Sequence, residues 1–185
     1  MNPRKLMPLP GIAFVLLAML SFLLGESTPD NTAPAATVAS FYHAHQARQM
    51  GAAFALVVAA LFLVIFAAVL VRVFWPADDG ERPVWEIVLC SGGALTGAVI
   101  LVGATVHFAL VDGASHVSGS ALQALNLVDG DIWVAFTPAL GVMMLGAAGT
   151  VLTRTTARRW LGWWALVLGI ALFVPFADFF AMLRS

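Results

Sequence analysis

This sequence contains few charged residues and little cysteine. Only 10% of its 185 residues are Asp, Glu, Lys or Arg, whereas ordinary soluble domains contain about 25%. The single cysteine, Cys90, excludes an internal disulfide and any zinc site built from several cysteines. Because the formal net charge is −1, no basic surface is available to neutralise phosphates, and we expect no nucleic-acid partner.

Recognised catalytic and transport patterns are also missing. The chain contains no GxSxG, HExxH or P-loop, and no GxGxxG before a helix. The residues of an intramembrane enzyme can come from separate helices, so an enzyme stays open. The chain has no internal repeat, which argues against a transporter built from two matching halves.

Apolar residues make up 61% of the chain, more than a core of this size can bury, so lipid must surround much of it. A membrane-spanning helix needs about 20 mostly apolar residues. We predict an all-α polytopic membrane helical bundle, a single integral membrane domain over residues 1–185 with five transmembrane helices and one or two short outer interfacial helices. The predicted spans are 7–24, 51–75, 84–111, 132–152 and 160–183.

The first apolar segment also has features of a signal peptide, because Arg4 and Lys5 precede a short apolar run. The one site with small residues two apart, Ala33-Pro34-Ala35, lies well beyond that run and contains a proline. We therefore expect this segment to remain as a membrane anchor.

The distribution of Lys and Arg predicts the orientation. With the N-terminus in the cytoplasm, seven of the nine basic residues lie inside and two, Arg48 and Arg184, lie outside. This favours a bacterial inner-membrane protein with a cytoplasmic N-terminus and an external C-terminus. All the histidines then fall on or near the outer side: His43, His45, His107 and His116.

The stretch ASFYHAHQARQM precedes the second predicted span. Its apolar residues recur at helical spacing, which predicts a short amphipathic helix from Ala33 that lies at the interface. We expect Asp30, Asn31 or Thr32 to cap this helix. Phe41 and His45 are four residues apart and share a face, whereas His43 points elsewhere, which weakens a metal pair at HAH.

A second short outer helix is predicted in SGSALQALNLVDGD, before the fourth span. Leu122, Leu125 and Val128 would form its apolar side. The two outer helices together would cap the bundle.

The third span contains a GxxxG pattern at Gly93 and Gly97, which allows another helix to approach closely. We expect a face that includes Cys90 and these glycines to pack against the bundle. His107 lies on the same face near the outer end, and a histidine inside a membrane segment is a candidate functional residue. Its possible partners are His45, Asp112, Asp131 and Asp178.

Three interpretations of the outer polar residues stay open. His45 and His107 make ordinary interfacial hydrogen bonds, or they bind zinc, copper or haem, or one of them is a general base paired with Asp131 or Asp178. Tyr42 joins them as a candidate ligand-binding residue. A carboxylate at Asp178, so close to the chain end, is expected to be hydrated.

Three stretches resemble a family of uncharacterised multi-pass bacterial membrane proteins: FYHAHQARQ, SALQALNLVDGD and RRWLGWWALVLGI. The aromatic pair followed by His corresponds to Phe41, Tyr42 and His45, and the Trp-Leu-Gly-Trp motif to Trp160–Trp163. The resemblance covers most of the chain and implies a shared architecture with no assigned activity. His43 does not belong to the family pattern.

These observations favour a non-enzymatic protein: an accessory, lipid-binding, small-ligand-binding or complex-forming subunit. Its expected partners are the lipid bilayer and either another membrane protein or a second copy of the chain. The competing hypotheses are a metal or haem protein and a membrane enzyme with a His/Asp acid–base pair.

Overall fold

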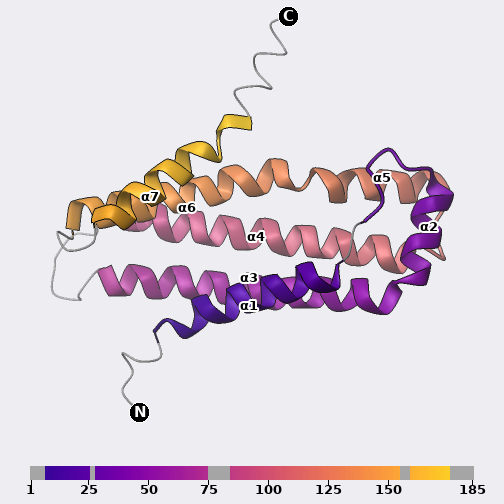
Figure 1. The fold of residues 1–185 in the computed structure, drawn as a ribbon, viewed down its shortest axis with the longest axis horizontal. Helices are drawn as coiled ribbons and strands as arrows, with labels where there is room; N and C mark the ends of the chain where they lie inside the picture. Colours follow the sequence, from indigo (N-terminus) through magenta and orange to yellow (C-terminus); the bar gives the residue numbers. More distant parts are fainter. Residues whose placement is uncertain (1–6, 26–27, 75–83, 155–158, 176–185) are drawn as a thin grey trace, which may run out of the picture. The chain divides into compact units, whose positions relative to one another are not determined.

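The computed structural model describes residues 7–25, 28–74, 84–154 and 159–175. Every regular element in these ranges is an α-helix (Figure 1), which confirms the all-α class. The helices are α1 (Leu9–Leu24), α2 (Ala35–Ala44), α3 (Gln46–Phe74), α4 (Val84–Gly113), α5 (Gly119–Asp131), α6 (Trp133–Arg154) and α7 (Arg159–Ala171).

Three stretches of the described chain are long and apolar enough to cross a membrane: Gln46–Val73, Val84–Gly113 and Gly119–Thr153. The apolar helices Leu9–Leu24 and Arg159–Ala171 are shorter. Leu9–Leu24 has 16 residues, about 24 Å at 1.5 Å per residue, against a hydrocarbon core of about 30 Å. Part of the predicted span 160–183 lies outside the described residues.

The chain divides into two compact units. The first, which we call the N-unit, comprises Met1–Phe62 and Ala98–Trp133; the second, the C-unit, comprises Leu63–Gly97 and Val134–Ser185. Helices α3 and α4 contribute one part to each unit.

In the N-unit, α2 begins directly after Pro34, which occupies the N-cap position without a side-chain capping bond. The prediction of a side-chain cap was wrong, because Asp30 uses its carboxylate elsewhere. Its Oδ1 accepts hydrogen bonds from the backbone N–H and the hydroxyl of Thr32, at 2.9 and 2.8 Å. Proline at a helix start loses nothing, since the first N–H groups of a helix have no internal partner. Helix α2 ends at Ala44 with His45 as its C-cap, and α3 starts at Gln46, five residues before the predicted span.

The second predicted outer helix is α5. Ser118 caps it and accepts a hydrogen bond from the backbone N–H of Ala121 at 3.4 Å. Helix α2 packs against α5 (Figure 1). A small apolar core joins α2, α4 and α5: Val38, Tyr42, Leu110, Val111 and Leu122. Val128, predicted on the buried side of α5, is exposed; the polar Asn126 is buried there instead.

Asn126 is buried because it has a specific backbone partner. Its side-chain amide donates to the carbonyl oxygen of Asp30 at 3.0 Å, and the amide of Gln123 donates to the carbonyl oxygen of Ala33 at 3.5 Å. These two hydrogen bonds attach the segment before α2 to α5.

Glycines let the helices of the C-unit approach at backbone distance. A Cβ added to Gly92 would collide with the backbone of Met143, and one added to Gly146 would collide with the backbone of Leu89. Helices α4 and α6 therefore touch through their main chains.

The prediction of the packed face of α4 is only partly correct. Gly93 lies against Ala67 of α3, and Gly97 is buried. Cys90 is exposed, so it was wrongly placed on the packed face. Gly92, one residue away from the predicted line, lies against the backbone of α6.

Candidate functional site

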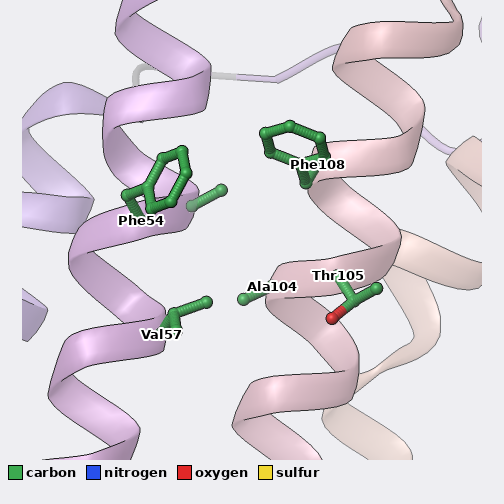
Figure 2. A pocket seen from close by; sticks show the side chains of 6 residues that line it. Phe54, Val57, Ala104, Thr105 and Phe108 are labelled. Atoms are coloured by element: carbon green, nitrogen blue, oxygen red, sulfur yellow. The ribbon is translucent and has the colours of Figure 1, made fainter.

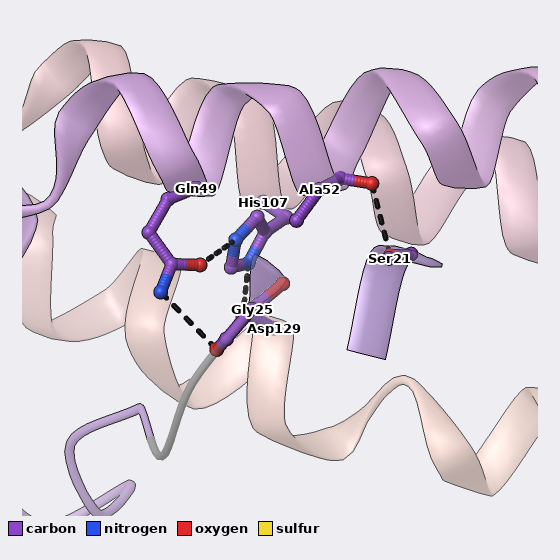
Figure 3. A network of polar contacts seen from close by, with 6 residues as sticks. All are labelled: Ser21, Gly25, Gln49, Ala52, His107 and Asp129. Carbon is purple, nitrogen blue, oxygen red and sulfur yellow. Dashed lines mark hydrogen bonds and ion pairs between the residues drawn. The ribbon is translucent and has the colours of Figure 1, made fainter. Parts of the chain in front are cut away.

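His107, near the C-terminal end of α4, is the centre of a polar network in the N-unit (Figure 3). Its Nδ1 lies 3.0 Å from Oδ2 of Asp129 on α5, and its Nε2 lies 3.0 Å from Oε1 of Gln49 on α3. The side chains of His107 and Asp129 are only 16% and 18% exposed. The network therefore joins three helices while retaining some access to solvent.

Gln49, in the first turn of α3, extends this network to α1. Its side-chain amide donates from Nε2 to the carbonyl oxygen of Gly25 at 3.2 Å, and Gly25 is the C-cap of α1. Gln49 is fully buried. Burying an amide is costly unless both of its ends are hydrogen-bonded, and here both ends have partners.

A second polar bond holds α1 against α3. The hydroxyl of Ser21 donates to the carbonyl oxygen of Ala52 at 2.9 Å (Figure 3). Ser21 is the buried residue of α1, and a Cβ added to Gly51 of α3 would lie 3.6 Å from Cδ1 of Leu24. The end of α1 is therefore attached to α3 at two levels.

Tyr42 from α2 lies beside the histidine. The Tyr42 and His107 ring centroids are 5.8 Å apart in an edge-to-face arrangement, which aromatic rings favour. The Tyr42 hydroxyl is buried and has no hydrogen-bond partner among the described residues. Burial, followed by the charge of Asp129, raises the pKa of this phenol well above its usual range.

The partner of His107 is Asp129, which was not among the partners expected from the sequence. Asp131 is exposed at the end of α5, and Asp178 lies outside the described residues. His45 stacks near Phe41, with ring centroids 4.6 Å apart, and its Nδ1 is 2.8 Å from the Phe41 carbonyl oxygen. The i, i+4 relation of Phe41 and His45 is thus present.

Sequence reasoning missed Asp129 and Gln49. Asp129 follows the buried Leu122 and Asn126 by seven and three residues, so helical spacing alone places it on their face. Gln49 lies just before an apolar run, where a polar residue is ordinarily taken as solvated. Only the position of α4 beside α3 shows that it is buried.

An apolar pocket opens between α3 and α4 in the N-unit (Figure 2). Its volume is about 220 Å³, and it is lined by Ala53, Phe54, Val57, Ala104, Thr105 and Phe108. The Phe54 and Phe108 ring centroids are 5.9 Å apart, and the two side chains are 62% and 37% exposed. Buried alanines form the floor, so the pocket exists because small residues lie between two large ones.

The geometry of His107 bears on the metal and enzyme hypotheses. A histidine must offer a ring lone pair to bind a metal or accept a proton, and both nitrogens of His107 are already in hydrogen bonds. The Asp129–Nδ1 bond is of the kind that orients metal-binding and basic histidines. For Nε2 to bind a metal or accept a proton, its hydrogen bond to Gln49 would have to break first. In the described ranges, no group of three or more His, Cys, Asp or Glu is placed to hold a metal ion.

No family model matches this chain, and neither do curated proteins or solved structures. The polar network and the pocket are therefore the features of this chain that bear on its function.

Proposed function

We propose that this protein crosses the bacterial inner membrane five times, with a cytoplasmic N-terminus and an external C-terminus. In this proposal it binds a lipid or a small apolar ligand and acts as an accessory or complex-forming subunit. The three stretches that are long and apolar enough to cross a membrane support the membrane setting. So do α1 and α7, which expose large apolar side chains: Phe22, Leu23, Trp160, Trp163 and Trp164. Tryptophan is enriched where a membrane meets water.

The pocket between α3 and α4 is the observation that carries the binding proposal. Its 220 Å³ is below the roughly 300–1,000 Å³ of sites for drug-sized ligands. A segment of an acyl chain fits this volume, because such a chain can extend beyond the pocket along the helix surface. The side chains of Phe54 and Phe108, whose ring centroids are 5.9 Å apart, would contact it together at one end of the pocket.

The polar network lies about one helical turn from the pocket. Gln49 precedes Ala53 by four residues, and His107 follows Ala104 by three, so each pair shares a helix face. The Gln49–His107 bond therefore bridges the same two helices that form the pocket walls. An amphipathic ligand would place its chain in the pocket and its polar end toward this bridge and α2.

Photo-crosslinking with an acyl chain that carries a diazirine tests the proposal. The protein is reconstituted in phospholipid nanodiscs, labelled, digested and mapped by mass spectrometry. Labelling should concentrate on 53–57 and 104–108. Ala104→Phe fills the floor and should lower labelling there about tenfold, the equivalent of about 1.4 kcal/mol of binding.

Val102→Phe is the matched control, because Val102 is on the same helix and 56% exposed. It should leave labelling of 53–57 unchanged. Uniform labelling of all apolar helix faces, unaffected by Ala104→Phe, would show that the pocket has no preference for a chain and would refute the binding function.

A further inference from the structure

Both ring nitrogens of His107 face hydrogen-bond acceptors. Nδ1 meets a carboxylate oxygen of Asp129, and Nε2 meets the amide oxygen of Gln49, each at 3.0 Å. A neutral imidazole has one N–H and one lone pair, whereas an imidazolium has two N–H groups. Only the protonated ring can donate to both neighbours in the observed arrangement.

The orientation of Gln49 is tied to the same proton. Its Nε2 donates to the carbonyl oxygen of Gly25, so its Oε1 faces the histidine. If the ring lost its Nε2 proton, the amide would have to turn to offer an N–H to the ring lone pair. The turned amide would then set its oxygen against the Gly25 carbonyl oxygen, and two acceptors cannot bond.

We propose that His107 is a proton-binding site, and that Gln49 converts its occupancy into attachment or release of the end of α1. With the proton bound, Nε2–H donates to Gln49, and Gln49 donates to Gly25. When the N–H bond breaks and the proton passes to water, the amide turns and the Gly25 bond is lost. The Gly25 carbonyl is one of those that a helix end leaves without an internal partner, so its attachment depends on this side chain.

Each element packed against the ring contributes a defined group. Helix α5 provides Asp129 and α2 provides Tyr42, while α3 and the end of α1 provide the uncharged Gln49 amide and Gly25 carbonyl. Tyr42 has a raised pKa, so it stays neutral over the range in which histidines titrate. Of these groups, Asp129 is the carboxylate that faces the ring, at Nδ1.

Ser21 supplies an internal reference. Its bond to the carbonyl oxygen of Ala52 also joins α1 to α3, but neither group titrates. Loss of the proton should therefore loosen the α1 end at Gly25 without detaching the helix at Ser21. This proton site does not require that the pocket be occupied, so it can be tested separately from ligand binding.

The first readout is the ring itself. The intact protein, labelled with ¹⁵N at histidine, is placed in nanodiscs and followed by NMR over the whole pH range in which it stays folded. His107, assigned with His107→Phe, should show two protonated ring nitrogens at the acidic end and one at the alkaline end. A ring with a single proton throughout, while the Gln49 amide still bonds Gly25, would overturn the proposal.

The second readout is hydrogen exchange of the amides in residues 21–25, corrected for the intrinsic pH dependence. Exchange should rise about fivefold as the ring loses its proton, the equivalent of about 1 kcal/mol, or one ordinary hydrogen bond. Gln49→Glu accepts from Nε2–H but, when ionised, has no N–H for Gly25, so exchange should be fast at every pH in the range. His107→Phe should abolish the pH step.

Gln123→Glu is the matched control. Gln123 also donates its amide to a backbone carbonyl, that of Ala33, but its bond is made on α5 away from α1. It should keep the wild-type pH profile. A pH step that persists in His107→Phe would mean that another group controls the end of α1, and the proposal would fail.

Discussion

The two units of this molecule hold their helices together by different means. In the N-unit, buried side chains reach backbone carbonyls or one another, as Ser21, Gln49 and Asn126 do. In the C-unit, helices meet where glycine removes the side chain altogether, at Gly92 and Gly146. The hydroxyl of Thr150 in that unit turns back to a carbonyl of its own helix.

The difference follows from what each unit has to join. The N-unit contains the ends of helices and short helices, whose terminal N–H and C=O groups lack partners, so polar side chains are needed. At Gly92 and Gly146 the C-unit joins interior parts of α4 and α6, whose backbone groups are already bonded. In lipid, such helices gain most from close van der Waals contact, which small residues permit.

The largest effect should come from Gly146→Leu. The new side chain would meet the backbone of Leu89, which cannot move without separating α4 from α6. We expect a loss of about 3 kcal/mol, the upper range for overpacking, measured as unfolding in mixed micelles. Gly51→Ala is the control, because its Cβ would be 3.6 Å from Leu24, an ordinary contact. Equal stability of the two variants would refute glycine-controlled packing.

Tyr42→Phe should increase the stability of the protein. The buried hydroxyl has no partner among the described residues, so removing it should raise the free energy of unfolding by about 1 kcal/mol, the lower range of the cost of an unsatisfied group. Thermal unfolding checks this. A loss of stability instead would show that the hydroxyl has a polar partner, such as a bound ligand.

The same phenol predicts an alkaline effect. Its folded pKa is raised, so above about pH 10 the unfolded chain releases a proton that the folded chain keeps. The free energy of unfolding should therefore be unaffected by this phenol below about pH 10. Above that pH it should fall by no more than about 1.4 kcal/mol per pH unit. Tyr42 is the only tyrosine, so tyrosinate absorbance reports it directly. Tyr42→Phe should remove this part of the decline.

The smallest expected effects come from removing buried hydroxyls, which bond either to another helix or within their own helix. Ser21→Ala removes a bond between helices and should cost about 1 kcal/mol. Thr150→Val removes a bond within one helix and keeps the shape, so it should cost about 0.5 kcal/mol or less. Parallel denaturation curves compare them. If Thr150→Val proves the more damaging, hydroxyls matter as much in the C-unit as in the N-unit.

Composition and periodicity were sufficient for the coarse architecture. The all-α class, the long apolar helices and both short helices, α2 and α5, were predicted from apolar spacing, because a helix displays its buried face at regular intervals in the sequence. Boundaries were less accurate: α3 begins at Gln46 rather than 51, because the preceding helix ends at Ala44 with His45 as its C-cap.

What the sequence determined by itself is local: which segments are helical, which are apolar, and that His107 is a polar residue within an apolar helix. The tertiary structure decided which acceptor each of its nitrogens meets. Asp129 and Gln49 are 22 positions after and 58 before it in the chain, and no local pattern encodes a contact over such separations. Pairing at that range depends on how helices pack, and packing distinguishes Asp129 from Asp131, two residues away on another face of the same helix.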